Sequence, residues 1–207
     1  MRPVVCSLAS AALVVAAVGG ARADGAGLGP RPDEATDGGE VRPQPHAPYR
    51  VNLRVGTAST DRNGMPSVCA EVRVWADLAV ESCGTGAQVW HNNDGAEMMH
   101  VRASWEVLDR TTARGRGGLR LGVGFAEMAV GADKLGFRFG EPDPDEPVSV
   151  AGPEVAVSAQ WTVPLGKGLE AVGTFTSGLA YFRGARQLVL PRDELQPFAS
   201  VDVGVGW

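Results

Sequence analysis

The chain has 207 residues, a formal net charge of -5, a sequence pI near 5.2 and a mean hydropathy of -0.05. An acidic chain without a basic face argues against nucleic acid as a partner. The hydrophobic share of 44% is enough to form a core, which excludes general disorder. No apolar run after residue 23 approaches the roughly 20 residues of a membrane-spanning helix.

Residues 1–23 have the pattern of a secretory signal peptide. Arg2 supplies the positive start, an apolar stretch follows over 4–18, and Ala21-Arg22-Ala23 matches the small residues before a cleavage site. The alternative is an N-terminal anchor helix, which the short apolar run disfavours. Cleavage would remove two arginines and no acid, so the formal charge would change from -5 to -7.

Residues 24–48 are rich in glycine, proline and acidic residues and show no hydrophobic periodicity. This composition predicts a flexible tether between the signal peptide and the rest of the chain. The remaining residues, 49–207, form the predicted single domain.

Apolar and other residues alternate with a period of two from Tyr49 to the end of the chain, as β-strands require. Longer connections are expected at 58–66, 86–96, 130–151 and 183–195, and shorter ones near Ala76, at 109–117 and at 164–167. This alternation of long and short connections predicts an all-β fold, an eight-stranded antiparallel up-and-down barrel. The expected strands are 49–57, 67–75, 77–85, 97–108, 118–129, 152–163, 168–182 and 196–207.

Two cysteines, Cys69 and Cys83, remain after the signal peptide, and an exported protein meets oxidising conditions. A tight turn centred on Ala76 would place them directly opposite each other on neighbouring strands, which predicts a disulfide. The alternative is a pair of buried thiols. The same register places Glu71 opposite Glu81, a pair that needs an arginine nearby or a raised pKa.

The less apolar face of the strands combines small residues with a nearly balanced set of charges. Small residues let eight strands close around a narrow interior, and charges in such an interior must be paired. We therefore predict a charge-paired lumen, the alternative being an ordinary solvated surface. Its expected members are Arg50, Arg54, Glu71, Arg73, Glu81, His100, Arg102, Glu106, Arg120, Glu154 and Asp202.

Aromatic residues of the apolar face fall near strand ends. In an up-and-down barrel, Tyr49, Trp105, Trp161 and Trp207 would lie at the rim with the short turns, and Tyr181 at the opposite rim. Two aromatic girdles at the rims of an apolar wall are typical of barrels that cross a membrane.

The last nine residues, ASVDVGVGW, resemble the C-terminal strand of bacterial outer-membrane β-barrel proteins. In that family alternate residues are apolar and the last is aromatic, usually Phe, where this chain has Trp207. The resemblance covers about 49–207 and is closest to small eight-stranded barrels of the OmpA and OmpX type. It implies export to the outer membrane of a Gram-negative envelope, the lipid bilayer as a partner and insertion by machinery that reads the C-terminal strand. A structural or interaction role through the long outer loops, with an extracellular partner, would follow.

Two other functions fit parts of the pattern. A soluble exported barrel that binds an apolar ligand would have its apolar face inside. Some eight-stranded outer-membrane barrels modify lipid A with His and Ser, but His100 and Ser104 here would lie about 13 Å apart along one strand. That separation is too large for a nucleophile and its base. The alternative is that His100 pairs with a Ser or Glu on a neighbouring strand, but the pattern favours a histidine packed in the lumen, so no enzymatic activity is predicted. No cofactor or metal is expected either.

Overall fold

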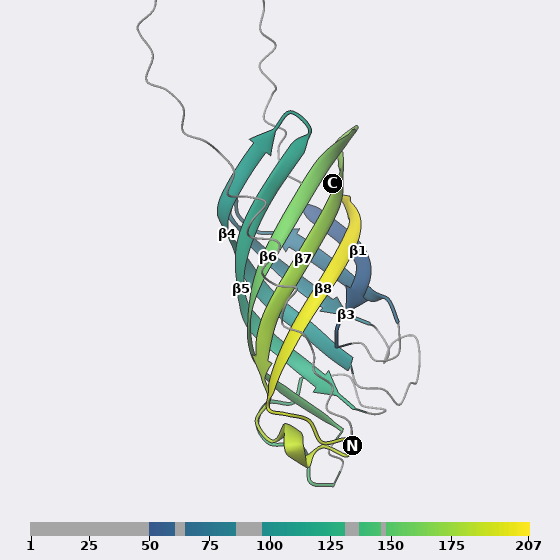
Figure 1. The fold of residues 1–207 in the computed structure, drawn as a ribbon, viewed down its shortest axis with the longest axis vertical. Helices are drawn as coiled ribbons and strands as arrows, with labels where there is room; N and C mark the ends of the chain where they lie inside the picture. Colours follow the sequence, from purple (N-terminus) through teal and green to yellow (C-terminus); the bar gives the residue numbers. More distant parts are fainter. Residues whose placement is uncertain (1–49, 61–64, 86–96, 131–136, 146–147) are drawn as a thin grey trace, which may run out of the picture. The chain divides into compact units, whose positions relative to one another are not determined.

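The computed structural model describes residues 50–60, 65–85, 97–130, 137–145 and 148–207. Eight antiparallel strands form a closed barrel, in which each strand pairs with its chain neighbours and β8 pairs with β1 (Figure 1). The predicted fold class is confirmed. No helix in these ranges is long and apolar enough to cross a membrane. The strands are β1 (Val51–Ala58), β2 (Ser67–Arg73), β3 (Leu78–Gly84), β4 (Glu97–Thr112), β5 (Gly115–Ala129), β6 (Ser149–Gly166), β7 (Leu169–Tyr181) and β8 (Leu195–Gly206).

The later strands are longer than the sequence pattern predicts. β4 and β5 continue through most of the expected 109–117 connection, and only residues 113–114 form the turn. A β-bulge between Glu106 and Leu108 shifts the alternation of side chains, so the period of two in the sequence is interrupted there although the strand continues. A second bulge follows Pro164 in β6. The β4–β5 and β6–β7 hairpins consequently extend beyond the β2–β3 turn, at the top of Figure 1.

The stagger of the strands fixes the width of the barrel. Paired residues lead from Gly206 through Asn52, Glu71, Glu81, Arg102, Gly124, Glu154 and Ala180 back to β8 at Gln196, ten residues before the start. Ten residues of stagger over eight strands correspond to a strand tilt of about 40°. A barrel of this size has room inside only for side chains.

The β2–β3 hairpin has the predicted register. Cys69 lies opposite Cys83 and Val72 opposite Val80, as a turn centred on Ala76 requires. The two cysteines are bonded, with Cα atoms 4.1 Å apart and side chains buried inside the barrel. The disulfide therefore joins two of the shortest strands, each of seven residues.

We expect the variant Cys69→Ala/Cys83→Ala to lose about 3 kcal/mol of unfolding free energy, because a closed loop of roughly 15 residues restricts the unfolded chain by that amount. Urea unfolding of the purified barrel would measure the loss. Ser82→Ala, in the same hairpin, is the control and should change the unfolding free energy by less than about 0.5 kcal/mol. Equal stability of the cysteine variant and the control would contradict this expectation.

The interior is apolar at the end where the long connections lie. A cluster of buried residues from β4–β8 meets the β7–β8 connection, which includes the short 3-10 helix η2 (Ala185–Gln187) at the bottom of Figure 1. The predicted polar face thus becomes apolar in this half of the barrel. The members of this apolar plug are Met98, Ala126, Met128, Val130, Val150, Ala156, Ala180, Phe182, Ala185, Leu188 and Phe198.

Candidate functional site: the lumen and the outer wall

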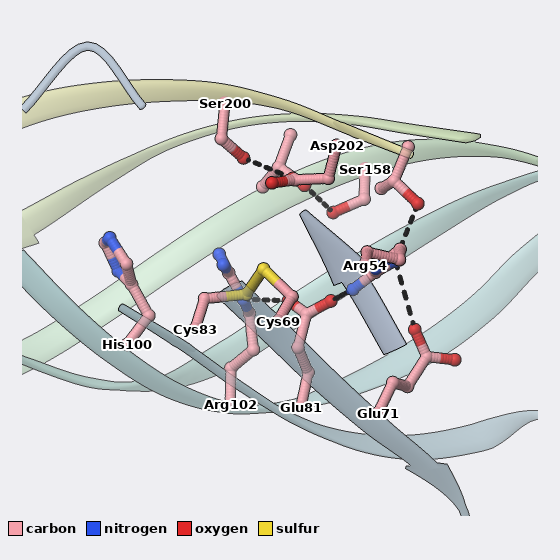
Figure 2. Close-up of a disulfide and its surroundings, with 12 residues drawn as sticks. Arg54, Cys69, Glu71, Glu81, Cys83, His100, Arg102, Ser158, Ser200 and Asp202 are labelled. Carbon is pink, nitrogen blue, oxygen red and sulfur yellow. Dashed lines mark hydrogen bonds and ion pairs between the residues drawn. A yellow bond between two sulfur atoms is a disulfide. The ribbon is translucent and has the colours of Figure 1, made fainter. Parts of the chain in front are cut away.

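Arg54 of β1 is the centre of the polar half of the lumen. Its side chain is 1% exposed and lies between Glu71 and Glu81, the two carboxylates that the β2–β3 register places opposite each other (Figure 2). Arg54 Nη1 is 3.3 Å from Glu71 Oε2, and Arg54 Nη2 donates a hydrogen bond to Glu81. Arg54 Nη1 also donates to Thr174 Oγ1 at 2.6 Å. The arginine that this carboxylate pair requires therefore comes from the preceding strand.

Ion pairs continue from Glu71 toward the short-turn end. Arg120 Nη1 lies 2.6 Å from Glu71 Oε1, and Arg120 Nη2 lies 3.6 Å from Glu106 Oε2. Glu106 also pairs with Arg73 at 3.3 Å and with Arg116 at 2.5 Å. Each carboxylate thus contacts more than one arginine, which compensates for the loss of water around a buried charge.

Ion pairs also continue from Glu81 toward the middle of the barrel. Arg102 Nε donates to Glu81 Oε1 at 2.7 Å, and Arg102 Nη1 is 3.9 Å from Glu154 Oε1. Glu154 Oε2 is 2.6 Å from His100 Nδ1. The ring centroids of Phe198 and His100 are 4.5 Å apart, and Arg102 Cζ lies 5.6 Å from the centroid of the Phe198 ring. Phe198 therefore marks the boundary between the ion pairs and the apolar plug.

The wall formed by β6–β8 is mainly neutral and polar. Gln160 Nε2 donates to Glu71 Oε2 at 3.3 Å, and the Ser158 and Thr176 hydroxyls are 3.0 Å apart. Ser200 donates to Asp202, which is 2% exposed on the inward face of β8 (Figure 2). We call all these inward-facing side chains, with the ion pairs, the lumen network.

Among the described residues, the predicted interior charges lie together in the lumen except Arg50, and all of these except Asp202, which hydrogen-bonds to Ser200, form ion pairs. Arg50 is exposed just before β1, and among the described residues only its backbone forms hydrogen bonds, with Arg73 and Trp207. Arg50 therefore lies outside the network, because the pairing of β1 with β2 and β8 ends at Val51 and Asn52. Sequence reasoning also missed Arg116, since it fell inside a predicted connection, and Gln160, since the pattern does not show which neutral residues reach a charge.

The outer wall is apolar around the whole barrel. Its side chains remain exposed by about half: Leu53 by 47%, Val123 by 56%, Val157 by 45% and Val203 by 66%. In the described strands, no outward-facing position between the level of Trp161 and that of Tyr181 carries a charge. Glu97 and Arg110 lie beyond these levels, and Glu127, near the end of β5, is buried with 4% of its surface exposed.

Aromatic residues lie at both edges of this wall. Trp105, Trp161 and Trp207 are about half exposed near the short-turn end, and Tyr49 lies outside the described residues. Trp75, 69% exposed in the β2–β3 turn, joins them; the sequence pattern missed it because it interrupts the alternation.

The opposite edge has Tyr181 and an aromatic cluster that the sequence did not predict. Phe137 packs against Phe125 of β5 with ring centroids 4.6 Å apart, and Phe139 lies 5.4 Å from Phe125. Phe139 also bridges to Ala151 of β6. Pro153 of β6 pairs with Phe125, and the next residue, Glu154, pairs with Ala180, which precedes Tyr181. Pro153 therefore marks this edge on β6, eight residues from Trp161. At a tilt near 40° this separates the two aromatic edges by about 20 Å along the barrel axis.

His100, the histidine of the lipid A hypothesis, is packed inside the barrel with a carboxylate and an aromatic ring as neighbours. The neighbours of His100 are Glu154 and Phe198. Ser104, which the sequence offered as a nucleophile, is buried on the same strand, two inward positions away from His100. No cluster of three metal-ligating side chains occurs among the residues that the structure describes. The arrangement fills and neutralises the interior.

Comparisons with known proteins provide no relative: the chain matches no protein-family model, no curated protein and no solved structure.

Proposed function

We propose that this chain is an integral outer-membrane β-barrel protein with a closed lumen. The observation that carries the proposal is the distribution of charge between the two faces of one wall: ion pairs line the inside, and an uncharged apolar surface about 20 Å high faces outward. Lipid-facing bands of membrane barrels are about 25 Å high, with aromatic girdles at both edges. In water, so large an apolar surface would be exposed to solvent, which is unfavourable.

The filled lumen favours a structural or interaction role over transport. Ion pairs occupy the short-turn half of the interior, and the apolar plug occupies the other half. We propose that the protein acts through its long connections, which would face the outside of the cell, where an extracellular partner could bind them. Insertion machinery would recognise the C-terminal strand that ends at Trp207.

The two alternatives receive less support from the geometry. A soluble barrel with an apolar ligand needs an apolar cavity inside, whereas the polar half of this interior is filled by paired charges. A lipid A-modifying enzyme needs a nucleophile beside its base, and His100 has Glu154 as its neighbour. We therefore propose no enzymatic activity.

Heat-dependent mobility tests the proposed membrane location. The protein should be found in the outer-membrane fraction, and the unboiled sample should migrate differently from the boiled one on an SDS gel, because a closed barrel resists unfolding by SDS. A protein recovered in the soluble periplasmic fraction, with the same mobility before and after boiling, would refute the proposal.

A further inference from the structure

An open groove of about 360 Å³ lies on the connection between β7 and β8. Arg186, Pro191, Arg192, Asp193 and Gln196 line it. The connection is folded: the Phe182 amide donates to Glu194 O at 2.7 Å, and the Arg192 amide donates to Ala185 O at 3.1 Å. Below it, Ala185 and Leu188 are buried in the apolar plug. Backbone hydrogen bonds and the apolar plug therefore hold the residues beneath the groove in place.

The charge of the groove favours an anion. Among the residues that the structure describes, two guanidinium groups line it together with the carboxylate of Asp193. Arg186 is exposed and Arg192 is half-buried, and both side chains line the groove. The planar guanidinium group donates two parallel hydrogen bonds to phosphate, which makes arginine well suited to that ligand.

An apolar surface adjoins the groove in the chain. Val189 and Leu190 precede the lining residue Pro191, and Leu195 precedes Gln196; the three apolar side chains are 54%, 46% and 56% exposed. Leu195 pairs with Tyr181, so the beginning of β8 lies at the aromatic edge of the outer wall. Cationic and apolar groups thus occur together where the proposed lipid-facing wall ends.

We propose that this groove binds the headgroup phosphate of an anionic membrane lipid. Arg186 and Arg192 would donate to the phosphate oxygens, and Val189, Leu190 and Leu195 would contact the acyl chains. A lipid is preferred over free phosphate because only a lipid uses both the cationic and the apolar parts. The inference rests on the proposed membrane location, since it needs the groove to lie at the lipid headgroups.

Binding can be measured with the full-length mature protein, folded in neutral detergent. The probes are lipid A, a neutral glycolipid with the same acyl chains, and inorganic phosphate. We expect lipid A to bind at least about tenfold more tightly than either of the others. We expect Arg186→Gln/Arg192→Gln to lower its affinity about tenfold, as loss of charge-assisted hydrogen bonds would. Asp193→Asn should tighten binding, because it removes a negative charge that faces the phosphate.

Arg183→Gln is the matched control. Arg183 belongs to the same connection and its side chain is 71% exposed, but it pairs with Glu141 and does not line the groove. This variant should bind lipid A as the unchanged protein does. An equal loss in Arg183→Gln would show attraction by net charge only, and would overturn the inference. Equal affinity for inorganic phosphate would also overturn it, in favour of a free anion.

Heat-dependent mobility separates failure of this inference from failure of the proposed function. The double variant and the exposed single variant Arg186→Gln should both keep the gel shift, which shows that they fold. A shift without preference for lipid A would refute the lipid site alone. Absence of both the shift and membrane location in the unchanged protein would refute the proposed function itself.

Discussion

Replacing Arg54 with methionine is expected to destabilise the barrel by about 3 kcal/mol. Arg54 is 1% exposed and neutralises part of the charge on both Glu71 and Glu81, which stay buried when the guanidinium group is removed. Methionine keeps much of the side-chain length, so the loss reports the uncompensated carboxylates and not a large cavity. Urea unfolding in lipid vesicles, or the temperature at which the gel shift disappears, would measure it.

A second substitution tests the cause of that loss. Arg54→Met combined with Glu81→Gln removes one of the two carboxylate charges that lose their arginine partner. We expect this double variant to recover part of the lost stability. Arg110→Met is the matched control, because Arg110 is exposed on the extended part of β4 and its loss should cost less than about 0.5 kcal/mol. If Arg54→Met were as harmless as Arg110→Met, the ion pairs would not stabilise the lumen network.

Replacing Val157 with arginine is expected to cost about 2–4 kcal/mol in a lipid bilayer. Val157 faces outward from β6, 45% exposed, four residues from Trp161 and four from Pro153. It therefore lies midway between the two aromatic edges. A guanidinium group there must leave water for hydrocarbon, which is most costly at the middle of the membrane. Reversible unfolding from lipid vesicles would give the difference in free energy.

Leu165→Arg is the control for this position. Leu165 also lies on β6 and is 59% exposed, but it is near the turn and four residues beyond Trp161. In a membrane, the cost at Leu165 should fall to about 0–1 kcal/mol, because the interface admits charge. A soluble barrel would tolerate arginine equally at both positions, within about 0.5 kcal/mol. Equal and small effects would therefore argue against the lipid-facing wall.

The strands and their pairing could be predicted because they depend on local patterns. A period of two in hydrophobicity defines which residues share a face, and the long and short connections define an up-and-down order. The β2–β3 register was also accessible, since only one register opposes Cys69 and Cys83 while it joins Val72 with Val80. The lengths of β4 and β5 could not be predicted, because the bulge at Glu106 reverses the alternation of apolar and polar residues, and no particular residue type marks it in the sequence.

The candidate site, too, could be predicted only in part. The residue types of the inner face were visible in the sequence, but their partners were not, because the stagger of the closed barrel decides which strands' side chains meet. Arg54 contacts carboxylates from β2 and β3 and a threonine from β7. The groove beside η2 likewise exists only after residues 182–194 fold onto the end of the barrel.

By itself, the sequence determined that this protein is a barrel with one apolar and one polar face, since a strand's alternation is a local property. Only the tertiary structure decided that the polar face turns inward, that Arg50 stays outside while Arg116 joins the ion pairs, and that an apolar plug fills the other half. Alternation is unchanged when a sheet is turned inside out. The direction in which it closes is therefore fixed by which side chains can fill and neutralise an interior as narrow as this one.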